Sequence, residues 1–176
     1  MSKFLNPSEI VAQMGLMQGQ TVADLGCGNG FYVLPAAQMV GGGGTVYAVD
    51  VQEAKLAATV SIANQFGYRN VRVHQADLAR PLLDLPQNSC DAIIIGNILH
   101  EINDKQQLLK NAYRLLKQSG KLLVVEWKKN TVPIGPPMNN RIDQEQAEVW
   151  FMNLGLRKAG ELNADSFHYA VMFEKV

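Results

Sequence analysis

The chain has 176 residues, the length of about one domain, and 47% of them are hydrophobic, so it can bury a core and is not an intrinsically disordered chain. Sixteen Lys and Arg balance sixteen Asp and Glu, which argues against a protein that works by neutralising nucleic-acid phosphates. No apolar run approaches the roughly 20 residues of a membrane-spanning helix, and the start lacks the apolar stretch of a signal peptide. Two cysteines, Cys27 and Cys90, are too few for a disulfide framework or a Cys-rich metal site. These features predict a single domain over residues 1–176, a cytoplasmic location and no metal site.

Short β-branched runs alternate with longer segments of helical period, which is the pattern of a mostly parallel sheet covered by helices. In chain order we expect a helix after Asn6, a strand over 21–25, a helix to about Val40, a strand over 45–50, a helix over 52–66, strands over 70–74 and 90–95, a helix after Asp104, a strand over 121–127, a helix after Asp143, and a closing antiparallel hairpin of about 156–162 and 167–175.

Several residues mark where the helices begin and end. Asn6-Pro7-Ser8-Glu9 offers an N-cap, Pro at the first helical position and an acid in the first turn. Pro35 is compatible with the second helix only if it lies in or near the first turn. Gly67 is placed to end the third helix, whose buried face is expected at Leu56, Val60 and Ala63.

The fourth and fifth helices are expected to begin at acidic residues. Asp104 with Gln107 resembles a capping box, and Gly120 is expected to end the fourth helix after Leu115 and Leu116. Asp143 with Gln146 is expected to open the last helix. Together these elements predict an α/β, doubly wound, Rossmann-like sheet of seven strands, in which ligands bind outside the carboxyl ends of the parallel strands.

The segment Asp24-Leu25-Gly26-Cys27-Gly28-Asn29-Gly30 follows the first strand and carries the strongest signal. Glycines let the backbone turn sharply and approach a ligand closely, and the next helix offers free N–H groups. A dinucleotide site would show G-x-G-x-x-G. Here the pattern is G-x-G-x-G with an acid two residues earlier, and that acid suits a cationic ligand better than a pyrophosphate.

This segment resembles motif I of the class I S-adenosylmethionine-dependent methyltransferases, and the resemblance continues over about residues 8–127. Val46 to Asp50 resembles the strand whose terminal acid binds the ribose, and Gln75 to Leu78 is similar to the segment that holds the adenine. Asp91 to Glu101 resembles motif IV, beneath the methionine part of the cofactor. The closest likeness is to the small-molecule, ubiquinone/menaquinone-biosynthesis type (type 11) branch. The related arsenite methyltransferases need several reactive thiols, which two cysteines do not supply.

The resemblance implies S-adenosyl-L-methionine as the cofactor and a set of residues that bind it: Asp24, Gly26, Cys27, Gly28, Gly30, Asp50, Val51, Asp77, Leu78, Asn97 and Ile98. Simpler readings stay open for two of them. Asp77 has the position of a common helix cap, and Asn97 has that of a turn residue at a strand end.

His100 and Glu126 are the catalytic candidates. An imidazole at position 100 could take a proton from the methyl acceptor, or it could be a helix-entry histidine that bonds only the backbone. Glu126 could orient a substrate or only close the rim of the sheet. Arg141 is expected at the surface, with an anion clamp as its alternative, and the substrate is expected between the N-terminal segment and the 97–103 and 127–141 loops.

The sequence therefore predicts a methyltransferase that moves a methyl group from S-adenosylmethionine to a small-molecule acceptor by in-line displacement. The alternative is a catalytically silent module that binds S-adenosylmethionine and regulates or scaffolds a partner protein. No nucleic-acid partner and no membrane span are expected, and a homodimer is compatible with the sequence.

Overall fold

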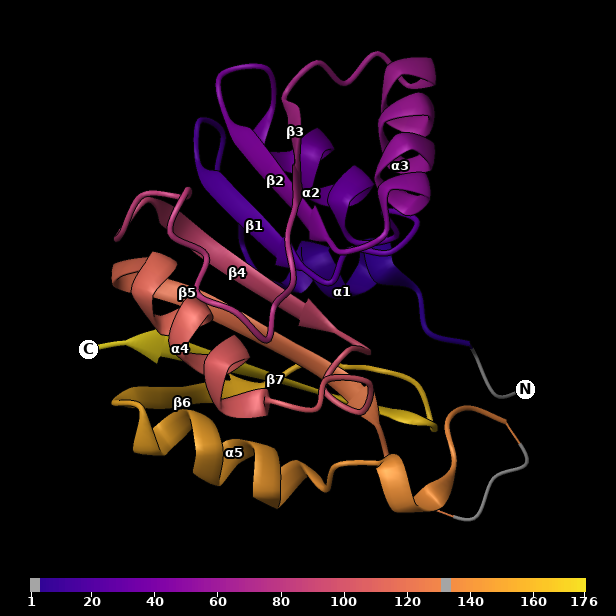
Figure 1. The fold of residues 1–176 in the computed structure, drawn as a ribbon, viewed down its shortest axis with the longest axis vertical. Coiled ribbons are helices and arrows are strands. Elements are labelled where there is room, and N and C mark those ends of the chain that lie inside the picture. Colours follow the sequence, from indigo (N-terminus) through magenta and orange to yellow (C-terminus); the bar gives the residue numbers. More distant parts are fainter. Residues whose placement is uncertain (1–3, 131–133) are drawn as a thin grey trace.

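The computed structural model describes residues 4–130 and 134–176. In these residues seven strands form one sheet in the order β3-β2-β1-β4-β5-β7-β6 (Figure 1). The strands are β1 (Thr21–Leu25), β2 (Thr45–Asp50), β3 (Val71–Gln75), β4 (Cys90–Gly96), β5 (Leu116–Trp127), β6 (Leu156–Glu161) and β7 (His168–Lys175). The first five strands are parallel, whereas β7 is antiparallel to both β5 and β6. The predicted α/β class and the closing antiparallel pair are confirmed.

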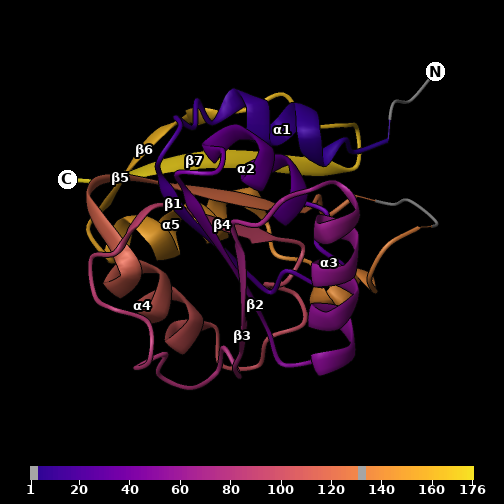
Figure 2. The ribbon, with the colours of Figure 1, turned by 90° about the horizontal axis from the view of Figure 1, so that it is seen from above.

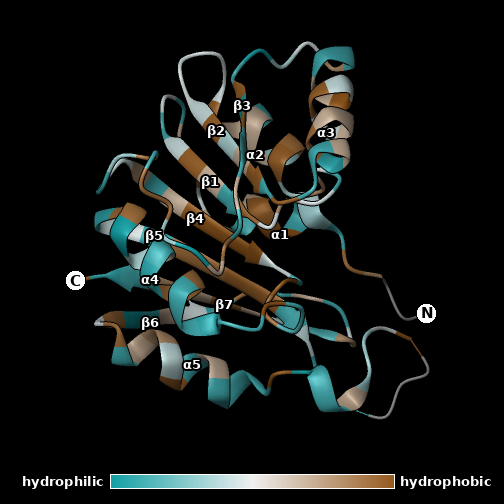
Figure 3. Cartoon of the chain, in the orientation of Figure 1, coloured by the Kyte–Doolittle hydropathy of each residue, from teal (hydrophilic) through white to brown (hydrophobic). Residues whose placement is uncertain are grey.

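Helices cover both faces of the sheet and bury its strands (Figure 2). On one face lie α1 (Pro7–Gln13), α2 (Val33–Val40) and α3 (Glu53–Gln65); on the other lie α4 (Lys105–Leu115) and α5 (Gln144–Asn153), and a short 3₁₀ helix, η1, spans Met138–Asn140. Successive residues of a strand face opposite sides, so the central strands are apolar almost throughout, as the hydropathy colouring shows (Figure 3). Among the described residues no helix is both long and apolar enough to cross a membrane.

The predicted helix ends agree with the structure at most positions. Asn6 caps α1 by accepting a hydrogen bond from the Ser8 N–H at 3.1 Å, and Asp104 caps α4 by accepting one from the Gln107 N–H at 3.1 Å. Gly67 follows α3 with a φ of +79°. Pro35 is the third residue of α2, within the first turn, where its missing N–H costs no helical hydrogen bond.

The end of α4 differs from the prediction. The helix stops at Leu115, and the backbone of Leu116 is already extended and pairs with Cys90 of β4. A Cβ on Gly120 would lie 2.7 Å from Leu116 Cδ1, so glycine is needed there for close packing within β5, and it does not end the helix. Helical periodicity extended the prediction too far because Leu115 and Leu116 are buried equally well by a helix and by the strand that follows.

The buried face of α3 also differs. Leu56 and Ala63 are buried as expected, but the third buried position is Thr59, while Val60 is only half-buried. The hydroxyl of Thr59 donates a hydrogen bond to the Gly28 carbonyl at 3.1 Å. This contact ties α3 to the glycine-rich turn, and such a polar tie is not visible in an apolar pattern.

Candidate functional site

The glycine-rich turn after β1 folds in a way that only glycine allows easily. Gly26, Gly28 and Gly30 have φ values of +85°, +52° and +81°. A Cβ on Gly26 would lie 2.6 Å from Ile98 Cγ1, and one on Gly30 would lie 2.7 Å from Thr59 Cγ2, whereas a Cβ on Gly28 would meet nothing within 4 Å. Gly26 and Gly30 therefore fix the turn against its neighbours, and Gly28 leaves its backbone open to a ligand.

Asp50, at the carboxyl end of β2, faces this turn. Its Oδ2 accepts a hydrogen bond from the Gly28 N–H at 2.9 Å, and its Oδ1 accepts one from the Gln52 N–H at 2.9 Å. The two bonds fix the orientation of the carboxylate. A carboxylate oxygen has more than one lone pair, so both oxygens can still accept hydrogen bonds from a diol.

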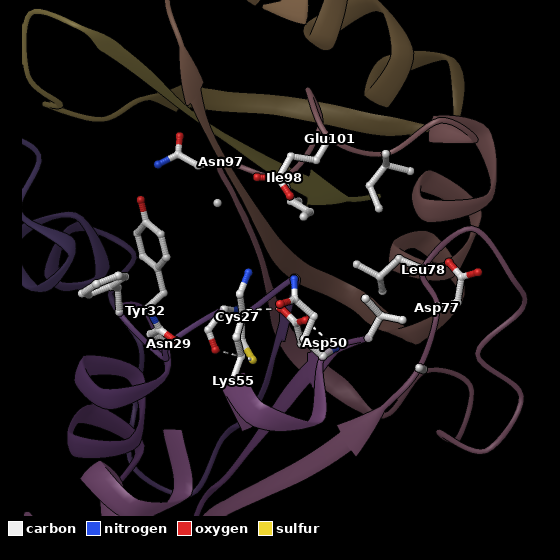
Figure 4. A pocket seen from close by; sticks show the side chains of 18 residues that line it. Cys27, Asn29, Tyr32, Asp50, Lys55, Asp77, Leu78, Asn97, Ile98 and Glu101 are labelled. Carbon is white, nitrogen blue, oxygen red and sulfur yellow. Dashed lines mark hydrogen bonds between the residues drawn. The ribbon is translucent and has the colours of Figure 1, made fainter. Parts of the chain in front are cut away.

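A cavity of about 430 Å³ opens at this edge of the sheet, a volume in the usual range for small-molecule sites (Figure 4). Nine of the residues predicted to bind the cofactor line it: Gly26, Cys27, Gly28, Asp50, Val51, Asp77, Leu78, Asn97 and Ile98. The sequence reasoning did not assign nine others: Asn29, Phe31, Tyr32, Gln52, Lys55, Ala76, Gly96, Glu101 and Ile102. Of the remaining predicted residues, Gly30 packs on Thr59 and Asp24 lies buried in β1.

Asp24 is 1% exposed, and neither of its carboxyl oxygens has a hydrogen-bond partner among the described residues. Burial, with a smaller contribution from the negative charge of Asp50, raises the pKa of Asp24 to about 8. A buried carboxyl group without a partner favours its neutral form. A cation bound close to this carboxyl group would favour its ionised form. The group therefore suits a positively charged ligand.

The two ends of the cavity differ in character. At one end the Asp77 carboxylate and the apolar Leu78 lie together, and the Asp77 Oδ1 also accepts a hydrogen bond from the Ala79 N–H at 2.9 Å, as in a turn. At the other end Asn97 follows β4 with a φ of +55°, and its side-chain oxygen is buried without a partner among the described residues. Asn97 thus combines the predicted turn geometry with a place in the cavity wall. Asp77 also lies in the wall, but it forms a turn and no helix begins there, so the alternative of a helix cap is wrong.

His100 and Glu126 form a close pair beside this cavity. The His100 Nδ1 lies 2.9 Å from both carboxylate oxygens of Glu126, whose side chain is fully buried. The same carboxylate accepts hydrogen bonds from the backbone N–H of His100 at 3.0 Å and of Trp127 at 3.1 Å. With Glu126 ionised, and therefore only an acceptor, the proton is on Nδ1 and the lone pair is on Nε2.

A second cavity of about 730 Å³ adjoins the first, and His100 lines it. Glu101 and Ile102 line both cavities, so the two spaces meet at the segment that follows β4. The opposite wall is formed by Pro136, Pro137, Asn139, Asn140 and Ile142. The predicted substrate region therefore has an open space at the 97–103 and 127–141 loops, although residues 1–3 and 131–133 lie outside the described residues.

Arg141 is 4% exposed, so neither the surface position nor the anion clamp predicted for it is correct. Its guanidinium donates hydrogen bonds to the carbonyls of Lys128, Asn130, Ile134 and Pro136 at 2.6 to 3.1 Å. It also lies over the Trp127 ring, 5.6 Å from the centroid. Arg141 thus holds together the backbone on both sides of residues 131–133.

Comparison with known proteins agrees with this geometry. A family described as "Methyltransferase domain" matches residues 16–171. The ubiquinone/menaquinone biosynthesis C-methyltransferase UbiE of Escherichia coli O1:K1 is 33% identical over 159 residues, which is 88% of this chain and 59% of that protein. The chain therefore spans about 59% of the length of this curated relative.

Solved structures show the same fold. An S-adenosylmethionine-dependent methyltransferase from Aquifex aeolicus has a TM-score of 0.88 and 28% identity, with 98% of this chain and 91% of that chain covered. A Sulfolobus solfataricus protein described as a type 11 methyltransferase has a TM-score of 0.79 and 24% identity. The match covers 98% of this chain and 94% of that chain.

The strand order and the cavity at its switch point define a Rossmann-like α/β protein with a site for a small ligand. The chain belongs to the S-adenosylmethionine-dependent methyltransferases. The residues present fit that cofactor, because the cavity joins an acidic and apolar end at Asp77 and Leu78, the Asp50 carboxylate near its centre, and a polar end at Asn97 (Figure 4).

Proposed function

We propose that this methyltransferase acts on a small-molecule acceptor bound in the second cavity, with His100 as the general base. The observation that carries the proposal is the position of His100. Its imidazole is held by the buried Glu126 and lines a cavity that meets the cofactor cavity at Glu101 and Ile102.

The residues of the first cavity would hold the cofactor. Asp77 and Leu78 would contact the adenine, Asp50 would accept hydrogen bonds from the ribose hydroxyls, and Asn97 would lie at the methionine part. The sulfonium of bound S-adenosylmethionine supplies an electrophilic methyl group, so the protein needs mainly to align the acceptor and to exclude water.

His100 takes the proton that the acceptor must lose. A neutral hydroxyl, amine or carbon acid becomes cationic when it gains a methyl group, unless its proton leaves. The Nε2 lone pair of His100 accepts that proton, and the imidazolium that forms is stabilised by Glu126 through Nδ1. Glu126 is therefore a positioning residue, which fixes the tautomer and the orientation of the ring.

The relatives support a small acceptor. UbiE is named as a C-methyltransferase of ubiquinone/menaquinone biosynthesis, and a carbon acceptor has a proton to lose. The second cavity, at about 730 Å³, has a volume in the usual range for a small-molecule ligand.

The test measures binding and transfer separately. Calorimetry should show saturable binding of S-adenosylmethionine to the wild type and to His100→Ala alike. Incubation with methyl-labelled S-adenosylmethionine and a metabolite library should yield a labelled product, followed by mass spectrometry. With that acceptor, His100→Ala should lower kcat by about 10²–10⁴-fold, the usual contribution of general-base catalysis.

Two controls separate the roles of the pair. Glu126→Gln should keep binding, but it should shift the pH profile of kcat because the imidazolium loses its counter-charge. Glu145→Gln changes an exposed residue that lines neither cavity and should leave kcat and its pH profile unchanged. Cofactor binding without transfer to any library compound would favour the silent binding module, and equal kcat values for wild type and His100→Ala would refute the base.

A further inference from the structure

Tyr32 lies between the glycine-rich turn and α2, and it lines the cofactor cavity. Its side chain is almost completely enclosed, with the residue 6% exposed, and its hydroxyl has no hydrogen-bond partner in the described part of the chain. Gly96 makes room for the ring, because a Cβ on Gly96 would lie 2.3 Å from Tyr32 Cε2. The ring position is thus fixed by the end of β4, while its polar atom is left unused.

The hydroxyl of Tyr32 is protonated at neutral pH and can therefore donate a hydrogen bond. Burial raises the pKa of this phenol well above its ordinary value, and the negative charges of Asp24, Glu126 and Asp165 raise it further. A phenol that stays protonated can donate to an anion. A buried donor without a partner is costly in the cofactor-free protein, so a ligand atom that accepts its hydrogen bond would recover that cost.

The position of Tyr32 identifies the part of the cofactor that it meets. Asp77 and Leu78 lie at one end of the cavity and Asp50 near its middle, whereas the Tyr32 hydroxyl points toward the same end as Asn97 (Figure 4). An extended cofactor with its ribose at Asp50 and its adenine at Leu78 therefore has its amino-acid group at Tyr32.

That amino-acid group carries an ammonium and a carboxylate, and the protein offers them different partners. The side-chain oxygen of Asn97, which has no partner among the described residues, is an acceptor suited to the ammonium. The carboxylate needs donors, in surroundings that already hold Asp24 and Glu126. The Tyr32 O–H is a side-chain donor at this end that has no hydrogen-bond partner among the described residues.

We infer that the Tyr32 hydroxyl donates a hydrogen bond to the carboxylate of the cofactor's methionine part, and that it selects S-adenosylmethionine over analogues without that carboxylate. The inference rests on the proposed binding of the cofactor in the first cavity.

A thermodynamic cycle that combines one change in the protein with one change in the ligand tests this inference. Calorimetry would measure the affinities of S-adenosylmethionine and decarboxylated S-adenosylmethionine for the wild type and for Tyr32→Phe, which keeps the ring against Gly96. Tyr32→Phe should lower the affinity for S-adenosylmethionine by about tenfold, as expected for a lost hydrogen bond to a charged group. It should leave the affinity for the decarboxylated analogue within about twofold, so the preference between the two ligands should fall.

Tyr47→Phe is the matched control. Tyr47 lies on β2 and does not line the cavity, so removing its hydroxyl should leave both affinities unchanged. Equal weakening of both ligands by Tyr32→Phe, or no weakening of either, would overturn the inference while leaving cofactor binding intact. Loss of the preference in Lys55→Met but not in Tyr32→Phe would assign the carboxylate to Lys55 and overturn it as well. Failure of the wild type to bind S-adenosylmethionine would instead refute the proposed function.

Discussion

Replacing Asp24 by Asn should remove most of the pH dependence of cofactor binding. The Asp24 carboxyl group is buried and has no hydrogen-bond partner among the described residues, and burial raises its pKa from 3.8 to about 8. In the cofactor-free protein it is therefore mostly protonated at neutral pH. A bound cation favours its ionised form, so binding releases a proton and becomes tighter as the pH rises.

The size of the effect follows from the fraction of Asp24 that is ionised. With a pKa of about 8, that fraction rises from about 0.3% at pH 5.5 to about 9% at pH 7.0. If only the ionised form binds the cofactor tightly, affinity should rise by about 30-fold over this range. The range lies below the ordinary pKa of an α-amino group, so the ammonium of the cofactor stays protonated.

Calorimetry from pH 5.5 to 7.0, in buffers with different ionisation enthalpies, measures both the affinity and the protons released. The wild type should release close to one proton per cofactor bound, and Asp24→Asn should release almost none and show a nearly flat affinity. Identical pH dependence in the two proteins would refute the assignment of the proton to Asp24.

The stability of the cofactor-free protein provides a second check with a defined sign. The folded pKa of Asp24 lies above the unfolded value, so the folded state holds a proton that the unfolded state loses above about pH 4. Stability from this group should therefore fall as the pH rises toward 8, by at most about 1.4 kcal/mol per pH unit. Asp24→Asn should lack this decline in chemical denaturation.

Three further substitutions test other parts of the site. Asp50→Ala should weaken S-adenosylmethionine binding by about 1–3 kcal/mol through lost charge-assisted hydrogen bonds; calorimetry would measure this, and an unchanged affinity would remove Asp50 from the site. Arg141→Met leaves four carbonyls without their donor and should lower the free energy of unfolding by about 2–4 kcal/mol, whereas a loss below about 0.5 kcal/mol in urea denaturation would contradict its role. Gly30→Ala should lower the free energy of unfolding by about 1–2 kcal/mol through its positive φ alone. Adding Thr59→Ser to this variant should restore only the part of the loss that comes from contact with the Thr59 methyl group. Full restoration in thermal denaturation would show that backbone strain is unimportant at Gly30.

Most of the fold could be predicted because its strands are marked by features that act locally. The central strands are apolar on both faces, and Asn6, Gly67 and Asp104 mark helix ends through their own hydrogen bonds and φ angles. The end of α4 could not be predicted, because Leu116 is apolar in either conformation and its extended state depends on pairing with Cys90, distant in the sequence.

The sequence identified those cavity residues that depend on their own backbone conformation, such as Gly28, or on their position directly after a strand, such as Asp50. It was missed where the role depends on tertiary surroundings. Tyr32 becomes a cavity residue only because Gly96 admits its ring. Arg141 looks like a surface residue in the sequence, since the carbonyls that bury it belong to a loop without a pattern of its own.

The position of β7 in the sheet affects the order in which parts of the protein can fold. β7 follows β6 in the chain but lies between β5 and β6 in the sheet, so β5 has an open edge until β7 inserts. During synthesis the half of the sheet that carries the glycine turn can form early, whereas Glu126 gains its neighbour, Tyr169, only at the end. A nascent chain could thus form the half of the sheet that carries the glycine-rich turn before β5 is covered, and any delay in the insertion of β7 would leave the open edge of β5 free to pair with other chains.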